Sequence, residues 1–133
     1  MPTHLETVIA KVNSYSDNLW ENLDRVPSLP LDAGRSLLAF FVHLACQCQN
    51  NANINLGRNA ILSLPHEWVC RSIQSVAEAQ LTLSDEWEYR RLLELYEQLD
   101  NELWIAHIAF GLSTSDPEII AAAIDSRDAR NGK

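Results

Sequence analysis

Residues 37–48 read Leu-Leu-Ala-Phe-Phe-Val-His-Leu-Ala-Cys-Gln-Cys and form the most apolar stretch of the chain. A helix without a polar face is usually buried on several sides, whereas a surface helix carries an apolar stripe opposite a polar one. We therefore expect a central helix that begins near Asp32, a suitable capping residue, and reaches toward Asn50. The other helices are expected to pack around it.

The preceding segment, residues 3–24, carries apolar residues at spacings of three and four, which is the pattern of an amphipathic helix. Thr3 and Glu6 have the spacing of a capping box, in which each side chain satisfies a free backbone N–H at the start of the helix. Ser14 and Ser16 weaken the middle of the segment. We therefore expect a helix with a kink or a break at these serines.

The remainder of the chain repeats the helical pattern, with apolar stripes separated by short polar segments. We expect a loop over residues 49–53, then a series of short helices up to Arg127, after which the polar end of the chain is expected to fray. No alternation of apolar and polar residues is long enough to predict a strand. The residues expected to cap or open these helices are Asn55, Pro65, Ser84, Asp100 and Ser115.

One of these helices carries a family resemblance. The stretch Ser115-Asp116-Pro117-Glu118-Ile119-Ile120-Ala121-Ala122-Ala123 resembles the second helix of a HEAT-type repeat, in which an Asp-containing start precedes apolar residues and an alanine pair. Residues 59–65 resemble the end of such a unit. Ile119-Ile120 stands where the family usually has Val-Arg. The resemblance implies an α-solenoid whose extended face binds other proteins, although a minority of the family acts on tetrapyrrole-bearing proteins.

These patterns predict an all-α fold of about seven helices, either a compact helical bundle or a short HEAT-like α-solenoid. Residues 1–133 are expected to form a single domain. Residues 1–50 would supply the N-terminal helices, including the buried central one, and residues 55–128 the HEAT-like helical hairpins. A chain of 133 residues buries roughly two-thirds of the surface that its unfolded form exposes, so it needs neither a metal nor a disulfide to hold a core.

The composition is acidic, since 18 Asp and Glu face 10 Lys and Arg, which gives a formal net charge of −8. Proteins that bind nucleic acid normally present a basic stripe to the phosphates, so this balance argues against a nucleic-acid partner. It suits instead a basic protein partner that is attracted by long-range electrostatics. The chain has no run of 18 apolar residues, and we therefore expect no membrane span.

The cysteines bear on the cellular compartment. Cys46, Cys48 and Cys70 form an odd set in a chain that is long enough to fold without disulfides. The N-terminal residues lack the basic segment and the apolar run of a signal peptide. Both observations predict a protein of the reducing cytoplasm.

A metal site is one interpretation of the central helix. His43 and Cys46 lie three residues apart, a spacing at which two side chains of one helix can bind one ion. Cys48 follows about 200° round the helix from Cys46, so a regular helix cannot direct both thiols at the same ion. A zinc site would need further ligands, such as His66 or Cys70. We favour buried thiols beside a hydrogen-bonded histidine, and expect no metal and no cofactor.

The sequence contains no recognisable catalytic motif: no phosphate-binding Gly-rich loop, no dinucleotide fingerprint and no nucleophile elbow. His107 lacks the glutamate three residues earlier that di-iron bundles require, because Trp104 stands there. Glu67 beside His66 could form a general-base pair, but both fall in a first helical turn, where such residues commonly cap. We therefore expect no enzymatic activity. A lyase with a groove around His66, Glu67 and His107 is the less favoured alternative.

Trp87 belongs to the segment Asp85-Glu86-Trp87-Glu88-Tyr89-Arg90-Arg91, a first helical turn that is otherwise charged. Trp, Tyr and Arg are frequent in interaction hot spots, and Trp87 could stack on Arg91 one turn later. The predicted partner-binding patch consists of Glu86, Trp87, Tyr89 and Arg90. The alternative is that Trp87 packs sideways on the neighbouring helix.

Together these observations predict a non-enzymatic, HEAT-like module for protein–protein interaction that uses its acidic surface to bind another protein. The alternative is an acidic inhibitor or immunity-type protein that masks a basic toxin or nuclease, for which the net charge of −8 is the support. The sequence does not identify the partner, and a homo-oligomer is compatible with it.

Overall fold

The computed structural model describes residues 3–47 and 49–131, and over these residues the chain is all-α, as predicted. Seven α-helices and two short 3-10 segments, joined by loops, make up the described chain, and no strand forms in it. The elements are α1 (His4–Asn13), η1 (Leu19–Glu21), η2 (Leu23–Ser28), α2 (Leu31–Ala45), α3 (Asn51–Ser63), α4 (His66–Gln80), α5 (Glu86–Leu99), α6 (Asn101–Ser113) and α7 (Pro117–Asn131).

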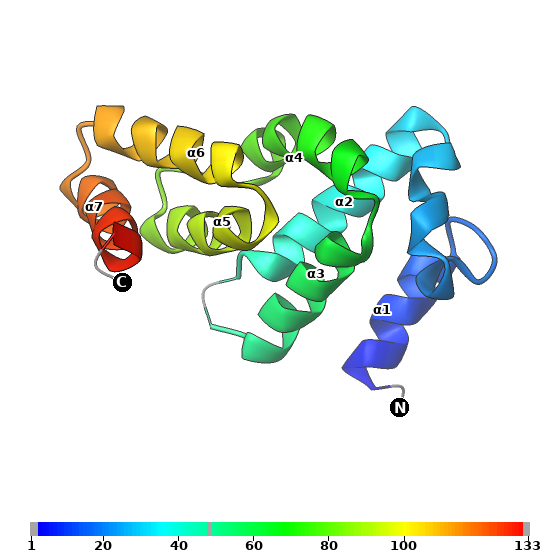
Figure 1. The fold of residues 1–133 in the computed structure, drawn as a ribbon. Coiled ribbons are helices and arrows are strands. Elements are labelled where there is room, and N and C mark those ends of the chain that lie inside the picture. Colours follow the sequence, from blue (N-terminus) through cyan, green and yellow to red (C-terminus); the bar gives the residue numbers. More distant parts are fainter. Residues whose placement is uncertain (1–2, 48, 132–133) are drawn as a thin grey trace.

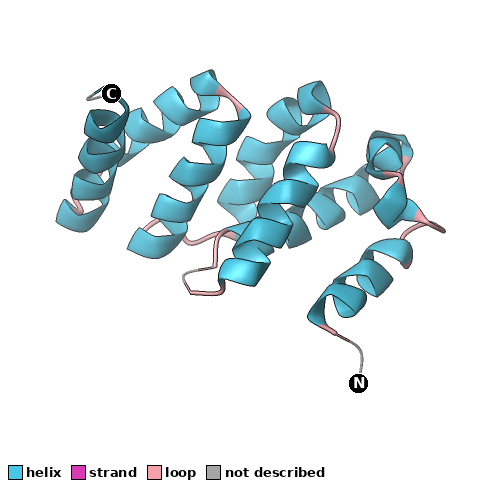
Figure 2. Cartoon of the chain, turned by 60° about the horizontal axis from the view of Figure 1, so that its bottom comes forward, coloured by secondary structure: helices cyan, strands magenta, loops and turns pink. Residues whose placement is uncertain are grey.

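The helices follow one another along the molecule in chain order, and the first and last helices lie at opposite ends of it (Figure 1). Helices α5, α6 and α7 pack against one another, whereas α2 packs against α3, α4 and α5 and so joins the two halves. Figure 2 shows the helices as a row of slanted rods joined by short loops. Among the described helices, none combines the length and the apolar character needed to cross a membrane.

Helix α2 is the centre of the core, as its apolar sequence predicts. Leu37, Leu38, Phe41 and Val42 are completely buried, and they belong to one continuous cluster of apolar side chains that extends from α1 to α7. His43, which we expected to be hydrogen-bonded beside the buried thiols, has its side chain exposed to solvent. The helix therefore keeps a narrow solvent-facing edge although it packs against neighbours on its other sides.

The expected break in the first segment is confirmed. Thr3 and Glu6 form the predicted capping box of α1, but the α-helix ends at Asn13 and does not continue to residue 24. The Ser14 hydroxyl donates a hydrogen bond to the Lys11 carbonyl, 2.5 Å away, and the Asn13 side chain accepts one from the Trp20 N–H at 2.8 Å. These polar side chains satisfy backbone groups outside an α-helix, which lets the chain turn into the 3-10 segments.

Two helix starts differ from the sequence prediction in the N-terminal half. Helix α2 begins after Pro30 rather than at a cap formed by Asp32. Helix α3 is capped by Asn50, whose side chain accepts a hydrogen bond from the Asn53 N–H at 3.1 Å, so most of the loop expected over residues 49–53 is helical. Asn55, the predicted cap, lies inside α3. Asn50 and Asn55 lie on either side of the observed start of α3. Asparagine is a good helix cap, so the sequence alone did not show which of the two residues begins the helix.

In the C-terminal half the caps are aspartates. Asp100 caps α6 as predicted. Helix α5 is capped by Asp85, whose carboxylate accepts from two backbone N–H groups, and not by Ser84. The Asp116 carboxylate likewise accepts from two N–H groups at the start of α7, where Ser115 was predicted. A charged carboxylate binds N–H groups more strongly than a hydroxyl does and suits the helix dipole. Helix α7 continues to Asn131, beyond the predicted fraying point at Arg127.

Helices α2 and α3 approach closely because Gly57 has no side chain. A Cβ atom at position 57 would lie 2.5 Å from the backbone nitrogen of Ala45 and 2.7 Å from the backbone oxygen of Phe41. These are backbone atoms of α2, which a rotamer change cannot move. No pattern in the sequence marks Gly57 as a contact residue, because a glycine within a helix is ordinarily expected only to lower the stability of that helix.

Candidate functional site

Helix α6 is apolar on all sides, since no Asp, Glu, Lys or Arg occurs from Leu103 to Ser113. One side of the helix is buried and packs on α5 and α7. The buried residues of this side are Trp104, His107, Ile108 and Gly111. A helix of this composition is usually buried all round. Exposure of its other side to solvent would therefore indicate a surface that another molecule can cover.

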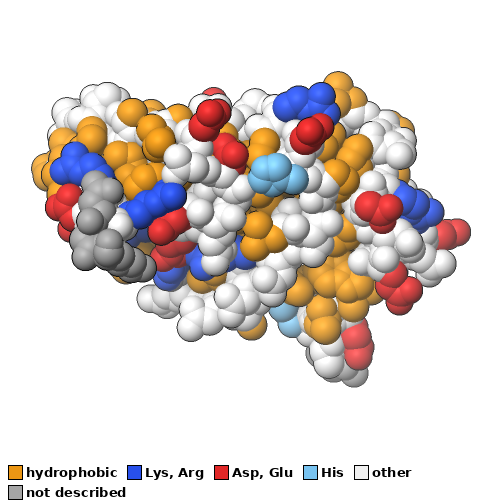
Figure 3. Space-filling model, in the orientation of Figure 1, with side chains coloured by type: hydrophobic (Ala, Val, Ile, Leu, Met, Phe, Trp, Pro, Cys, Tyr) orange, Lys and Arg blue, Asp and Glu red, His pale blue; other side chains and the backbone are white. Residues whose placement is uncertain are grey.

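The opposite side of α6 faces solvent. Ile105 is 52% exposed, Phe110 43% and Leu112 37%, and Ala106 and Ala109 lie exposed between them. We call these five residues the α6 face. Hydrophobic side chains are visible over α6 in the space-filling view (Figure 3). Contiguous exposed apolar surface of this kind marks interaction sites in soluble proteins.

A groove adjoins the α6 face on the side of α4. It has a volume of about 120 Å³, and Ala106 and Phe110 of α6 form part of its wall. Gln74 and Glu78 of α4 form part of the opposite wall. Helices α4 and α6 lie next to each other along the upper edge of Figure 1. The α6 face forms a ridge, and the groove forms a recess beside it. Glu78 is one of the residues that line this recess.

Beneath this surface, His107 and Tyr89 hold α6 against α5. The Tyr89 hydroxyl donates a hydrogen bond to the His107 carbonyl at 2.8 Å, and His107 Nε2 lies 3.3 Å from the Tyr89 carbonyl, to which it can donate. Their rings stack with centroids 4.2 Å apart. Burial lowers the pKa of His107 from its ordinary 6.5 to about 4. The imidazole is therefore neutral at pH 7 and serves as a rigid support for Phe110, whose ring stacks on it at 6.0 Å.

The position of the Tyr89 hydroxyl also explains why residue 111 is a glycine. A Cβ atom at position 111 would lie 2.0 Å from the Tyr89 oxygen, a distance that no pair of non-bonded atoms tolerates. Glycine at this position of α6 thus leaves room for the tyrosine to reach the His107 carbonyl.

Comparisons with protein-family models, with curated proteins and with solved structures find no match. The candidate site therefore rests on geometry and chemistry alone.

The patch predicted around Trp87 is only partly at the surface. Trp87 is 50% exposed and stacks on Arg91 as predicted, with the guanidinium carbon 5.8 Å from the ring centroid. Arg90 and Glu86, four residues apart on α5, form an ion pair at 3.4 Å. Arg90 also lies 3.6 Å from the Asp125 carboxylate of α7, so its charge connects two helices of the scaffold.

The inclusion of Tyr89 in that patch is wrong. Its side chain is completely buried and bonds to α6 as described above. Trp87 and Tyr89 are two residues apart, which separates them by about 200° on an α-helix. Trp87 faces solvent and Tyr89 faces the core, so the two cannot contact one partner together.

Replacement of Trp87 by alanine is expected to lower the free energy of unfolding by less than about 1 kcal/mol, because half of the ring is already in water and one stacking contact is lost. Thermal denaturation would measure this, with Trp104→Ala as the matched control. Trp104 is buried and donates a hydrogen bond to Ser126, so its truncation should cost about 3–5 kcal/mol. Equal losses for the two variants would place Trp87 in the core.

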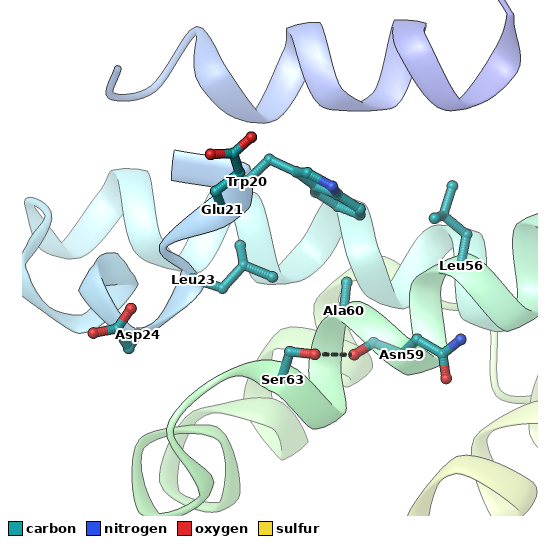
Figure 4. Close-up of a pocket in the computed structure, with 8 residues that line it drawn as sticks. All are labelled: Trp20, Glu21, Leu23, Asp24, Leu56, Asn59, Ala60 and Ser63. Carbon is teal, nitrogen blue, oxygen red and sulfur yellow. Dashed lines mark hydrogen bonds between the residues drawn. The ribbon is translucent and has the colours of Figure 1, made fainter. Parts of the chain in front are cut away.

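A hollow with a volume of about 530 Å³ lies between the 3-10 segments and α3 (Figure 4). Trp20 and Leu56 contribute apolar surface to it, and Figure 4 shows the Trp20 indole directed toward α3. The carboxylates of Glu21 and Asp24 point away from the indole. Polar groups therefore do not converge on this hollow, unlike those of a built ligand site.

The structure does not assemble the zinc site considered for the central helix. His43 is exposed, whereas Cys46 is buried, and burial raises the pKa of the Cys46 thiol to about 12. A thiol must lose its proton to bind a metal, so Cys46 is a poor ligand. Cys48 lies outside the described residues.

The three residues suggested for a lyase site are not brought together: His107 lines the groove between α4 and α6, but His66 and Glu67 do not. His107 is enclosed by aromatic rings of α5 and α6, while His66 lies exposed in the first turn of α4 together with Glu67. The residues that the structure does gather are His66, Cys70 and Asp100, whose ligand atoms lie within 4.8 Å of one another.

Proposed function

We propose that this chain is a non-enzymatic, HEAT-like helical module that binds another protein through the α6 face and the adjoining groove. The observation that carries the proposal is the exposure of Ile105, Phe110 and Leu112 on a helix without charged residues from Leu103 to Ser113. Short stacked helices that present one side to a partner are the usual recognition surface of helical-repeat proteins. The all-α row of helices is compatible with such a repeat.

Burial of the α6 face would supply the driving force. Complete burial of an exposed large apolar side chain contributes about 1.5–3 kcal/mol, and these three side chains are each about half exposed, so each has roughly 1 kcal/mol left to gain. The adjacent groove would receive one projecting apolar side chain of the partner. Of the three side chains, Phe110 borders the recess, whereas Ile105 and Leu112 lie about 140–160° round α6 from it. A partner would therefore have to cover the whole exposed arc of α6, with Ala106 and Ala109 at its centre.

Charge indicates the chemistry of the partner. The net charge is −8, Glu78 borders the groove, and Glu102 lies exposed at the start of α6. A partner with an apolar ridge flanked by Lys or Arg would match this surface. An acidic inhibitor of a basic protein is the narrower form of the same proposal. In that case the association rate should fall steeply as salt is added, because long-range attraction is screened.

The double variant Ile105→Asp/Phe110→Asp is expected to lose partner binding by at least about a hundredfold, because two carboxylates would be buried against an apolar ridge. The protein would be immobilised, its partner isolated from the native host, and the affinity for the purified partner measured by calorimetry. Leu62→Asp is the matched control: Leu62 of α3 is 43% exposed, as Phe110 is, but it lies outside the α6 face. Circular dichroism would verify that each variant is folded.

Three outcomes are distinguishable. Loss of binding in the double variant with retention in Leu62→Asp supports the α6 face. Equal affinity of wild type and folded double variant contradicts it. Dimers of the wild type in light scattering that dissociate in the double variant would identify the partner as a second copy of this chain.

A further inference from the structure

His66, Cys70 and Asp100 meet where the start of α4 approaches the start of α6. His66 and Cys70 lie four residues apart on α4, so both side chains project from one face of the helix. Asp100 caps α6, and its Oδ2 accepts a hydrogen bond from the Leu103 N–H at 3.2 Å. The cap uses Oδ2, so the carboxylate keeps a second oxygen for another ligand. Residues far apart in sequence thus bring one nitrogen, one sulfur and one oxygen donor together.

The distances suit a small cation. Cys70 Sγ lies 3.5 Å from His66 Nε2, and all three ligand atoms lie within 4.8 Å of one another. Zinc binds sulfur at about 2.3 Å and imidazole nitrogen at about 2.0–2.1 Å, so a tetrahedral ion holds these two atoms about 3.6 Å apart. The sulfur–nitrogen pair is therefore already spaced for zinc. The carboxylate oxygen lies within 4.8 Å of both atoms, whereas a tetrahedral zinc ion would hold it about 3.4–3.6 Å from each, so the oxygen would have to approach them by at most about 1.4 Å.

The donor set selects the class of metal. Thiolate and imidazole favour zinc and similar transition-metal ions, whereas calcium and magnesium prefer oxygen donors alone. Burial raises the pKa of the Cys70 thiol, and the negative charge of Asp100 raises it further. A raised pKa opposes metal binding, so the thiol would have to release its proton to solvent when a cation binds, and the geometry of the three ligands carries the inference.

The cluster is open to solvent and has one ligand position left for a further donor. His66 is exposed and Cys70 and Asp100 are partly buried, so an ion can enter from solvent. Three protein ligands leave the fourth tetrahedral position open for water or for a side chain of another protein. The site lies one helical turn from the groove, since Gln74 follows Cys70 on α4 and Leu103 follows Asp100 on α6, and both line it.

The geometry points to a transition-metal site, with Zn²⁺ as the expected ion, formed by His66, Cys70 and Asp100. A bound ion would connect α4 to α6 at one end of the groove. This inference does not depend on the proposed protein partner, because metal binding can be measured on the chain alone.

Titration with Co²⁺ tests the site directly, because cobalt replaces zinc and a cobalt–thiolate bond produces a charge-transfer absorption in the near ultraviolet. The wild type should show this band at one equivalent of cobalt, and Zn²⁺ should abolish it. Cys70→Ser should remove the band, and His66→Gln and Asp100→Asn should each weaken zinc binding at least about tenfold. Asparagine is itself a good cap, so Asp100→Asn removes the charge and keeps the start of α6.

Matched controls separate the cluster from other donors. His43→Gln removes an exposed histidine of α2, and Cys48→Ser removes a different thiol; both should bind zinc as the wild type does. Zinc should also raise the melting temperature of the wild type but not that of Cys70→Ser, since a ligand that binds the native state stabilises it. Absence of a thiolate band in the wild type, or a band that persists in Cys70→Ser, would overturn the inference.

Discussion

Replacement of Gly57 by alanine is expected to destabilise the protein by about 3 kcal/mol, at the upper end of the cost of overpacking. The new methyl group would lie 2.5 Å from the Ala45 nitrogen and 2.7 Å from the Phe41 oxygen. Alanine is the better helix former by about 1 kcal/mol, which opposes the effect. The clash outweighs this gain because backbone atoms of α2 can yield only if the two helices separate, and their separation would open the core.

Urea denaturation of wild type and variant would measure the difference, with Gly34→Ala as the matched control. A Cβ atom at Gly34 would lie 3.3 Å from the Trp68 side chain and 3.4 Å from the Val26 oxygen, contacts that a small shift of the indole relieves. Clash and helix propensity then nearly cancel, and the change should stay within about 1 kcal/mol. If Gly57→Ala were as stable as Gly34→Ala, the close approach of α2 and α3 would be refuted.

The second large effect is a loss of stability in acid that originates at His107. Its pKa in the folded protein is lowered from 6.5 to about 4, so between these values the unfolded chain binds a proton that the folded chain excludes. Stability therefore rises with pH in this window and falls as the solution is acidified through it. Between pH 7 and pH 4 the contribution of this residue amounts to roughly 3 kcal/mol.

His107→Gln isolates the effect, because glutamine can still donate a hydrogen bond to the Tyr89 carbonyl but does not titrate. The variant will be less stable at pH 7, where the stacked ring is lost, but its stability should decline less steeply toward pH 4. The difference between the two curves of unfolding free energy against pH cancels the carboxylates common to both. Parallel curves would show that His107 is protonated in the folded protein as readily as in the unfolded one.

Much of the fold could be predicted from the helical spacing of apolar residues and from the residues that typically begin and end helices. The apolar run of residues 37–48 correctly placed the central helix, since few arrangements other than burial suit such a segment. The break at Ser14 and the cap at Asp100 were also predictable, because each rests on hydrogen bonds between neighbours in sequence. The errors at Ser84 and Ser115 are shifts of one residue, where an adjacent aspartate competes for the same N–H groups.

The candidate site was less predictable. The angle of about 200° between Trp87 and Tyr89 argues against a joint patch, but which of the two faces the core depends on how α5 packs against α6. The α6 face was not predictable, because a helix that is apolar all round does not indicate which side its neighbours cover. The meeting of Cys70 with Asp100 likewise depends on how α4 lies against α6, which no local pattern encodes.

The contact between Tyr89 and Gly111 has a consequence for how this chain can vary in evolution. The two positions share one volume, so any residue larger than glycine at 111 requires a shorter side chain at 89. Shortening Tyr89 alone would leave a void and an unbonded His107 carbonyl lone pair, and enlarging Gly111 alone would expel the phenol. Substitutions at these positions should therefore occur as a pair, and a homologue that keeps tyrosine at the first should keep glycine at the second.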